Sequence, residues 1–279
     1  MKTNYHTHCS FCDGDSAPED MVRAALDKGF DILGFSSHAP LAGEEDWTLS
    51  EEDVPEYIRQ ITDLKEQYRD RLAVLIGLER DYVPGRPVWP VNRWGDFQLD
   101  FTIGSVHMMP GETPETPYAI DGPVDDVRHL VENVYKGDVR KMAGDFYGIT
   151  ADMVRRETFD FLGHLDVLRK RNLAYPFLKE EEPWYLKTVC DLLDVIAREG
   201  VLIEINTGGI SRGATETVYP SAPILRECRK RDIPVVINSD AHSPKDLDAH
   251  FELARQAALD AGYREESVMM DGAWSSIKL

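Results

Sequence analysis

The chain has 279 residues, 42% hydrophobic and 29% charged, a composition typical of a globular protein with a large core. Asp and Glu number 50 against 31 Lys and Arg, a formal net charge of −19, which argues against a nucleic-acid-binding protein because such proteins need a basic surface. No apolar run is long enough for a membrane span and no signal-peptide pattern follows Met1, so we expect a cytoplasmic protein with no membrane partner.

Short apolar runs alternate with amphipathic stretches along the chain, and this alternation is typical of repeated βα units. A strand is predicted at 3–7, and Ser16 to Glu19 reads as a capping box that opens a helix at 16–28. The following predicted pairs are a strand at 32–36 with a helix at 50–69, and strands at 73–78 and 101–106 with helices within 124–158.

The second half of the chain continues the same alternation. Strands are predicted at 159–163, 201–205 and 235–237, and helices at 182–199, 222–231 and 244–261. Seven βα units fit a single (β/α) barrel domain spanning 1–279. Two stretches rich in Pro and Gly, 84–97 and 110–123, fit no unit; they follow the third and fourth strands, where loop insertions lie on the active-site face of a barrel.

Six of the seven predicted strands end in residues of metal-binding types. They are His6 and His8, His38, Glu79, His107, His164, and Asp240 with His242. The carboxyl ends of barrel strands converge on one face, and residues two apart on a strand point the same way. These side chains exceed the needs of one tetrahedral ion, so two or three ions are predicted, and mixed imidazole and carboxylate ligands suit Zn, Fe or Mn.

Structural explanations compete with the metal site at each position. A single histidine at a strand end is commonly a hydrogen-bonded structural residue, but six of the eight histidines lie at such ends. Cys9 and Cys12 have no second pair nearby, which favours packing over metal binding. No G-x-S-x-G elbow surrounds a serine, and no phosphate-binding glycine loop is present.

The motifs at 6–8, 34–40, 77–82, 104–107, 163–166 and 238–242, in this order, resemble those of the polymerase-and-histidinol-phosphatase (PHP) family. The resemblance covers residues 4 to about 243 and implies a distorted (β/α)7 barrel, TIM-barrel-like, with about three divalent metal ions. It implies that the first ion is bound by His6, His8, Glu79 and Asp240. Glu79 would bridge to a second ion at His107 and His164. The third would take His38, His242 and one ligand that is often His in the family; here Asp13 is the first choice and Asp15 the alternative.

Within the family the motifs are most similar to histidinol-phosphatases. This implies hydrolysis of L-histidinol phosphate to L-histidinol and phosphate, in histidine biosynthesis, by a hydroxide bridging two metals at Glu79. Asp240 is expected to orient the hydroxide and His242 to pass a proton to the leaving alkoxide. Binding of phosphate favours a guanidinium fork, so Arg212 is the first candidate, followed by Arg169 or Lys170. Histidinol would need a carboxylate and an aromatic wall, for which the loops offer Asp81, Tyr82, Trp89 and Trp94.

Three other functions remain open from the sequence. Another small phosphate ester, such as a nucleotide or sugar phosphate, would need the same chemistry with different loops. An amidohydrolase also uses His-x-His on a barrel, but that class typically bridges its metals with a carboxylated lysine after the fourth strand, where this chain has His107. A non-catalytic metal-binding protein would show bound metal without turnover.

Overall fold

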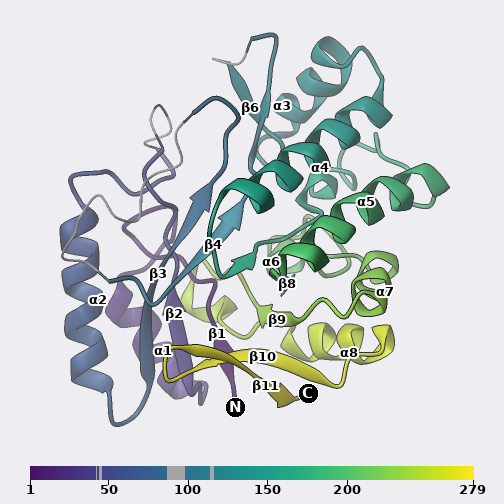
Figure 1. Ribbon diagram of the computed structural model, residues 1–279. Coiled ribbons are helices and arrows are strands. Elements are labelled where there is room, and N and C mark those ends of the chain that lie inside the picture. The colour runs from purple at the N-terminus through teal and green to yellow at the C-terminus, as the bar shows by residue number, and fades with distance from the viewer. Residues whose placement is uncertain (42, 44–45, 87–97, 114–115) are drawn as a thin grey trace.

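The computed structural model describes residues 1–41, 43, 46–86, 98–113 and 116–279. Seven parallel strands form one sheet in the order β1-β2-β3-β4-β7-β8-β9 (Figure 1). Their bounds are Thr3–Asn4 (β1), Ile32–Phe35 (β2), Ala73–Asp81 (β3), Phe101–Ser105 (β4), Phe161–Leu162 (β7), Leu202–Asn206 (β8) and Val235–Asn238 (β9). Because neighbours in the sheet are also consecutive among these strands, each strand enters the sheet beside its predecessor.

The first and last strands of the sheet meet at their carboxyl ends. Thr7 and Ala241 form a parallel bridge. The amide of His8 donates to the Ala241 carbonyl at 2.8 Å, and the amide of Ala241 donates to the His6 carbonyl at 3.1 Å. These bonds close the sheet, and they confirm the predicted seven-stranded barrel.

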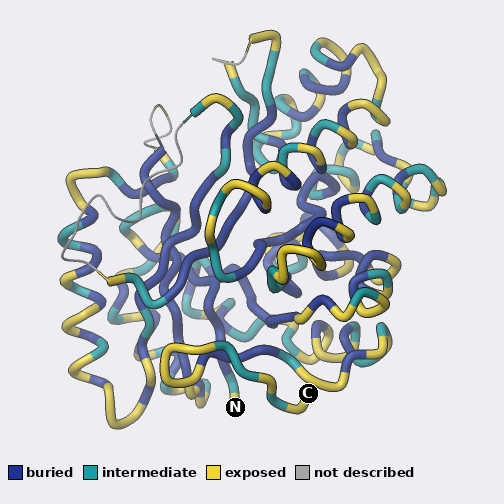
Figure 2. Tube along the Cα trace, viewed as in Figure 1, coloured by how far each residue is buried: buried dark blue, intermediate teal, exposed yellow. Residues whose placement is uncertain are grey.

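Helices surround the barrel and turn their buried faces toward it (Figure 2), and the buried residues of the long helices are mostly apolar. They are α1 (Pro18–Asp27), α2 (Val54–Tyr68), α3 (Val124–His129), α4 (Val139–Arg156), α5 (Pro183–Glu199), α6 (Gly208–Ser211), α7 (Ala222–Lys230) and α8 (Phe251–Ala261). A π-helical turn, Leu130–Val134, follows α3. None of the described helices combines the length and apolar character needed to cross a membrane.

Aromatic and aliphatic side chains fill the barrel at the end where its strands begin. Tyr5, Phe101 and Phe161 are buried there, and Trp274 packs against two of them, with ring centroids 5.1 Å from Tyr5 and 5.8 Å from Phe161. Trp274 belongs to a C-terminal hairpin, β10 (Glu265–Met270) and β11 (Ala273–Lys278), which crosses this end of the barrel (Figure 1). The hairpin closes this end, so the opposite end holds the cavity.

The structure corrects the predicted ends of two helices. The capping box at 16–19 is wrong, because Ala17 directly precedes α1 without a side-chain cap and the Ser16 hydroxyl donates to Asp15 instead, at 2.6 Å. The predicted helix at 244–261 is wrong in its first part. A short 3-10 turn, Pro244–Asp246, is followed by His250 at a φ of 62°, and α8 begins only after it.

The structure describes most of one of the two predicted loop insertions and little of the other. The 110–123 stretch holds half of a small antiparallel hairpin, in which β5 (Met108–Pro110) pairs with β6 (Pro117–Ala119). In the 84–97 stretch, residues 87–97 lie outside the described part of the chain, and so do the predicted aromatic candidates Trp89 and Trp94.

Candidate metal centre

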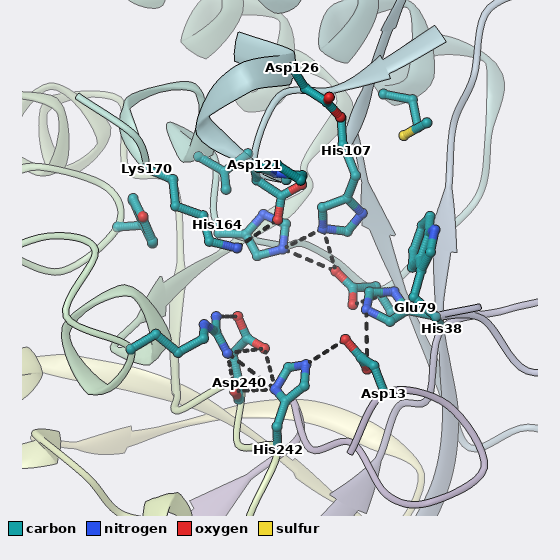
Figure 3. Close-up of a pocket in the computed structure, with 18 residues that line it drawn as sticks. Asp13, His38, Glu79, His107, Asp121, Asp126, His164, Lys170, Asp240 and His242 are labelled. Carbon is teal, nitrogen blue, oxygen red and sulfur yellow. Dashed lines mark hydrogen bonds and ion pairs between the residues drawn. The ribbon is translucent and has the colours of Figure 1, made fainter. Parts of the chain in front are cut away.

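The carboxyl ends of the barrel strands surround a cavity of about 430 Å³. Nine side chains predicted as metal ligands converge at its base: His6, His8, Asp13, His38, Glu79, His107, His164, Asp240 and His242. Figure 3 shows His107 and His164 on one side of the cavity and Asp13, Asp240 and His242 on the other. Asp13 and His242 are partly open to solvent, whereas the other seven are buried.

Glu79 lies at the centre of this group, near the end of β3. Its Oε2 atom is 3.1 Å from His6 Nε2 and 3.5 Å from His8 Nε2, while its Oε1 atom is 3.1 Å from His164 Nε2. On the Oε1 side, the Nε2 atoms of His107 and His164 are 3.1 Å apart. The two oxygens therefore face two different sets of imidazoles, as a carboxylate that bridges two metal ions must.

Asp240 faces the first set of imidazoles. Its Oδ1 atom lies 3.5 Å from His8 Nε2 and 3.8 Å from His6 Nε2. Asp240 adopts a φ of 52° just after β9, a region that aspartate enters more readily than most residues. Potential ligand atoms of His6, His8 and Asp240 all lie within 4.8 Å of one another.

A third group of donors lies on the open side of the cavity. Asp13 Oδ2 is 3.1 Å from His242 Nε2, and Asp13 Oδ1 is 3.5 Å from His8 Nδ1 and 3.8 Å from His38 Nε2. Gly14 allows this turn, because a Cβ atom there would lie 2.4 Å from the backbone nitrogen of Cys9. Asp13 therefore reaches the group, whereas the alternative candidate Asp15 binds Ser16.

Two buried carboxylates outside the predicted ligand set orient its histidines. His6 Nδ1 donates to Glu204 Oε1 at 2.7 Å, and His107 Nδ1 donates to Asp81 Oδ1 at 2.7 Å. Each bond fixes the tautomer that turns Nε2 toward the cavity, as is common for metal-bound histidines. Glu204 is not among the site residues predicted from the sequence. Asp81, a candidate for contacting the substrate, is buried and binds His107 instead.

The potential ligand atoms of this cluster are better arranged to bind cations than to hydrogen-bond with one another. The buried atoms His8 Nε2 and His38 Nδ1 have no hydrogen-bond partner among the described residues, a costly arrangement unless something else completes it. Burial and the neighbouring His242 and His38 hold the pKa of His8 well below its ordinary value, so its ring is neutral and offers a lone pair. Burial would raise the pKa of Glu79, but the nearby imidazoles outweigh it and hold this pKa well below the usual value. Burial would lower the pKa of His6, but Glu204, Glu79 and Asp240 outweigh it and hold this pKa well above the ordinary value. The carboxylates therefore favour positive charge here, which a divalent cation would supply in place of the proton.

Two of the three predicted phosphate-binding residues line the cavity. Arg212 Nη2 donates to Asp240 Oδ2 at 2.6 Å, and its Nη1 donates to the Asp240 carbonyl at 3.0 Å. Lys170 pairs with Asp121 at 2.7 Å. Arg169 does not line the cavity: it is buried, binds Asp166 at 2.8 Å, and is therefore an internal structural cation.

Comparison with known proteins agrees with this geometry. The PHP domain model matches residues 4–208. The chain is 31% identical to a Deinococcus radiodurans protein named "Probable histidinol-phosphatase", covering 93% of each chain, and 26% identical to the histidinol-phosphatase of Bacillus subtilis, covering 90% of this chain and 97% of the relative. The crystal structure of a Lactococcus lactis histidinol phosphate phosphatase, complexed with Zn, L-histidinol and phosphate, shares the fold with a TM-score of 0.73, 21% identity and 98% coverage of both chains. The chain belongs to the PHP domain family.

Proposed function

We propose that this protein is a metal-dependent phosphatase that hydrolyses L-histidinol phosphate to L-histidinol and phosphate. The observation that carries the proposal is the cluster around Glu79, where nine potential metal ligands meet at the base of one cavity. Its similarity over nearly full length to proteins named as histidinol-phosphatases supports the choice of substrate.

We assign about three divalent ions to this cluster, following the three groups of donors. His6, His8, Glu79 and Asp240 would hold the first, Glu79 with His107 and His164 the second, and Asp13, His38 and His242 the third. Zn is the metal present in the structurally similar Lactococcus lactis protein, and Fe and Mn suit the same ligand types. Such ions, when bound, supply Lewis acidity toward phosphoryl oxygens and lower the pKa of coordinated water.

The chain's own groups would position the reactants. Arg212 holds Asp240 Oδ2, which leaves Oδ1 facing the imidazoles, so Asp240 would accept a hydrogen bond from the attacking water and orient it. His242 is the most exposed of the candidate histidines, with 25% of its side chain accessible. It is therefore placed to meet the leaving group, and we assign it the transfer of a proton to the alkoxide in the two-ion form of the site, because a histidine bound to the third ion is a poor acid.

The outer part of the cavity suits a cationic leaving group. Asp126, on α3, lines the cavity, and its carboxylate has no hydrogen-bond or ion-pair partner within the described ranges. Trp47 contributes an aromatic surface to the same cavity. The ammonium group of histidinol would bind Asp126, and its imidazole would lie against the apolar lining.

The test is release of phosphate from histidinol phosphate, measured beside a panel of nucleotide and sugar phosphates, with metal analysis of the same sample. We expect two to three ions per chain and a kcat/KM for histidinol phosphate at least tenfold above that of any other ester. Preference for a nucleotide or sugar phosphate would keep the chemistry and refute the substrate. Tightly bound metal without turnover of any ester would refute the phosphatase function itself.

A further inference from the structure

A hydroxyl group without a partner lies in the wall of the cavity. Tyr219 is 1% exposed, yet it lines the cavity. Its Oη atom is buried and has no hydrogen-bond partner among the residues that the structure describes. Burying a hydroxyl without a hydrogen bond is unfavourable, and such groups in native proteins call for an explanation.

The chain holds Tyr219 firmly in this place. Its backbone pairs with Asn206 at the end of β8, through amide-to-carbonyl hydrogen bonds of 2.9 and 2.7 Å. The Arg169 guanidinium lies over its ring, 4.7 Å from the centroid. This explains the position of Arg169, which supports the cavity wall without lining it.

Two consecutive glycines make room for Tyr219 and for Arg212. A Cβ atom on Gly209 would lie 2.8 Å from Tyr219 Oη, and one on Gly208 would lie 2.6 Å from Arg212 Nη2. The hydroxyl and the guanidinium therefore pack against neighbouring residues of one short segment. Both residues carry hydrogen-bond donors and line the cavity, and Arg212 also binds Asp240.

We propose that the Tyr219 hydroxyl donates a hydrogen bond to a non-bridging oxygen of the phosphoryl group, beside Arg212. The inference rests on the proposed phosphatase function, since it assigns a ligand to the phosphate of that reaction. Burial raises the pKa of Tyr219 above its ordinary value, which keeps the hydroxyl protonated and able to donate. The same bond forms with substrate and with inorganic phosphate, because both present non-bridging oxygens.

The test compares Tyr219→Phe with Tyr263→Phe in the metal-loaded protein. The Tyr263 hydroxyl is buried too, but it donates to the Ile233 carbonyl at 2.9 Å, outside the cavity lining. We measure the Kd of inorganic phosphate by calorimetry, together with metal content, melting temperature and kcat/KM. A hydrogen bond to an anion is worth roughly 10- to 100-fold in affinity.

We expect Tyr219→Phe to weaken phosphate binding by that factor, with unchanged metal content and an equal or higher melting temperature, because an unsatisfied hydroxyl has been removed. Tyr263→Phe should lower the melting temperature and leave phosphate affinity unchanged. Gly209→Ala should weaken phosphate binding as well, by displacing the Tyr219 ring.

Phosphate affinity of Tyr219→Phe within twofold of the wild type would overturn the inference. Because phosphate binding is measured without turnover, it tests the role of Tyr219 independently of the proposed phosphatase function. A wild-type protein that binds phosphate but does not hydrolyse histidinol phosphate would refute the function, and the Tyr219→Phe affinity would still decide the inference.

Discussion

Glu204 gathers four hydrogen-bond donors beneath the metal centre. Its Oε1 atom accepts from His6 Nδ1 at 2.7 Å and from Asn238 Nδ2 at 3.0 Å. Its Oε2 atom accepts from the His164 amide at 2.9 Å and from Asn206 Nδ2 at 2.8 Å. The side chain is completely buried, so water cannot replace any of these bonds.

Glu204→Gln keeps the shape of the side chain and replaces one acceptor oxygen with an NH2 group. Each carboxylate oxygen accepts two hydrogen bonds. In either orientation of the glutamine side chain, the NH2 group takes the place of one of these oxygens and cannot accept from the two N–H groups that point at it. Two bonds to a charged acceptor are lost, each worth about 1.5–3 kcal/mol, and the smaller burial penalty of a neutral amide offsets part of that loss. We expect the free energy of unfolding to fall by about 3 kcal/mol, and the metal affinity of the His6 site to fall by roughly 10- to 100-fold.

The assay is urea unfolding of the metal-free protein, together with metal content after equilibration against graded concentrations of a competing chelator. Glu199→Gln, at an exposed position at the end of α5, is the matched control and should change neither quantity. Unaltered metal affinity in a folded Glu204→Gln protein would refute the role of Glu204 in orienting His6. An unaltered free energy of unfolding would refute the conclusion that Glu204 accepts hydrogen bonds from four donors.

Four other changes test the cavity lining, the packing of the C-terminal hairpin and the metal centre. Asp126→Asn should raise KM for histidinol phosphate by about tenfold and spare p-nitrophenyl phosphate, which carries no amine; equal effects on both esters would contradict the ammonium site. Arg212→Lys should raise KM for every phosphate ester, because one ammonium cannot replace a fork that also binds Asp240; an unchanged KM would exclude Arg212 from the phosphate site. Trp274→Ala should lower the free energy of unfolding by about 2–3 kcal/mol, less than for a fully buried ring, and leave metal content unchanged, as measured on the folded fraction. Removal of metal with EDTA should abolish turnover and lower the melting temperature, and added Zn or Mn should restore both; activity that survives complete metal removal would contradict a metal-dependent reaction.

The convergence of the candidate ligand residues could be predicted because strand geometry is local and regular. His6 and His8 are two residues apart at a strand end, and a barrel brings all such ends together. The orienting carboxylates depend on contacts between distant segments, and for these the sequence gives only a weak signal. Glu204 is a charged residue between Ile203 and Ile205 in an apolar strand, and such a residue must find a buried partner. Its partner, His6, is 198 residues away, and no local pattern identifies it.

The wrong helix ends have local causes as well. Pro18 occupies the first turn of α1, so Ala17, not Ser16, precedes the helix. His250 adopts a φ of 62°, which helical periodicity does not reveal. The hairpin of β10 and β11 did have a signal: Asp271 and Gly272 both take positive φ angles, 51° and 75°, and the Asp-Gly pair is a favoured two-residue hairpin turn.

The acidity of the chain and its anionic substrate are compatible because metals would set the sign of charge in the cavity. Five carboxylates line it against one lysine and one arginine, and both of these are already paired, Lys170 with Asp121 and Arg212 with Asp240. Without metals this lining would repel a phosphate ester, whereas two or three divalent ions would reverse the field at the base. We therefore expect metal to bind before phosphate. Asp126 remains outside the ligand set, so the outer cavity stays acidic and favours an ester whose leaving group carries a positive charge.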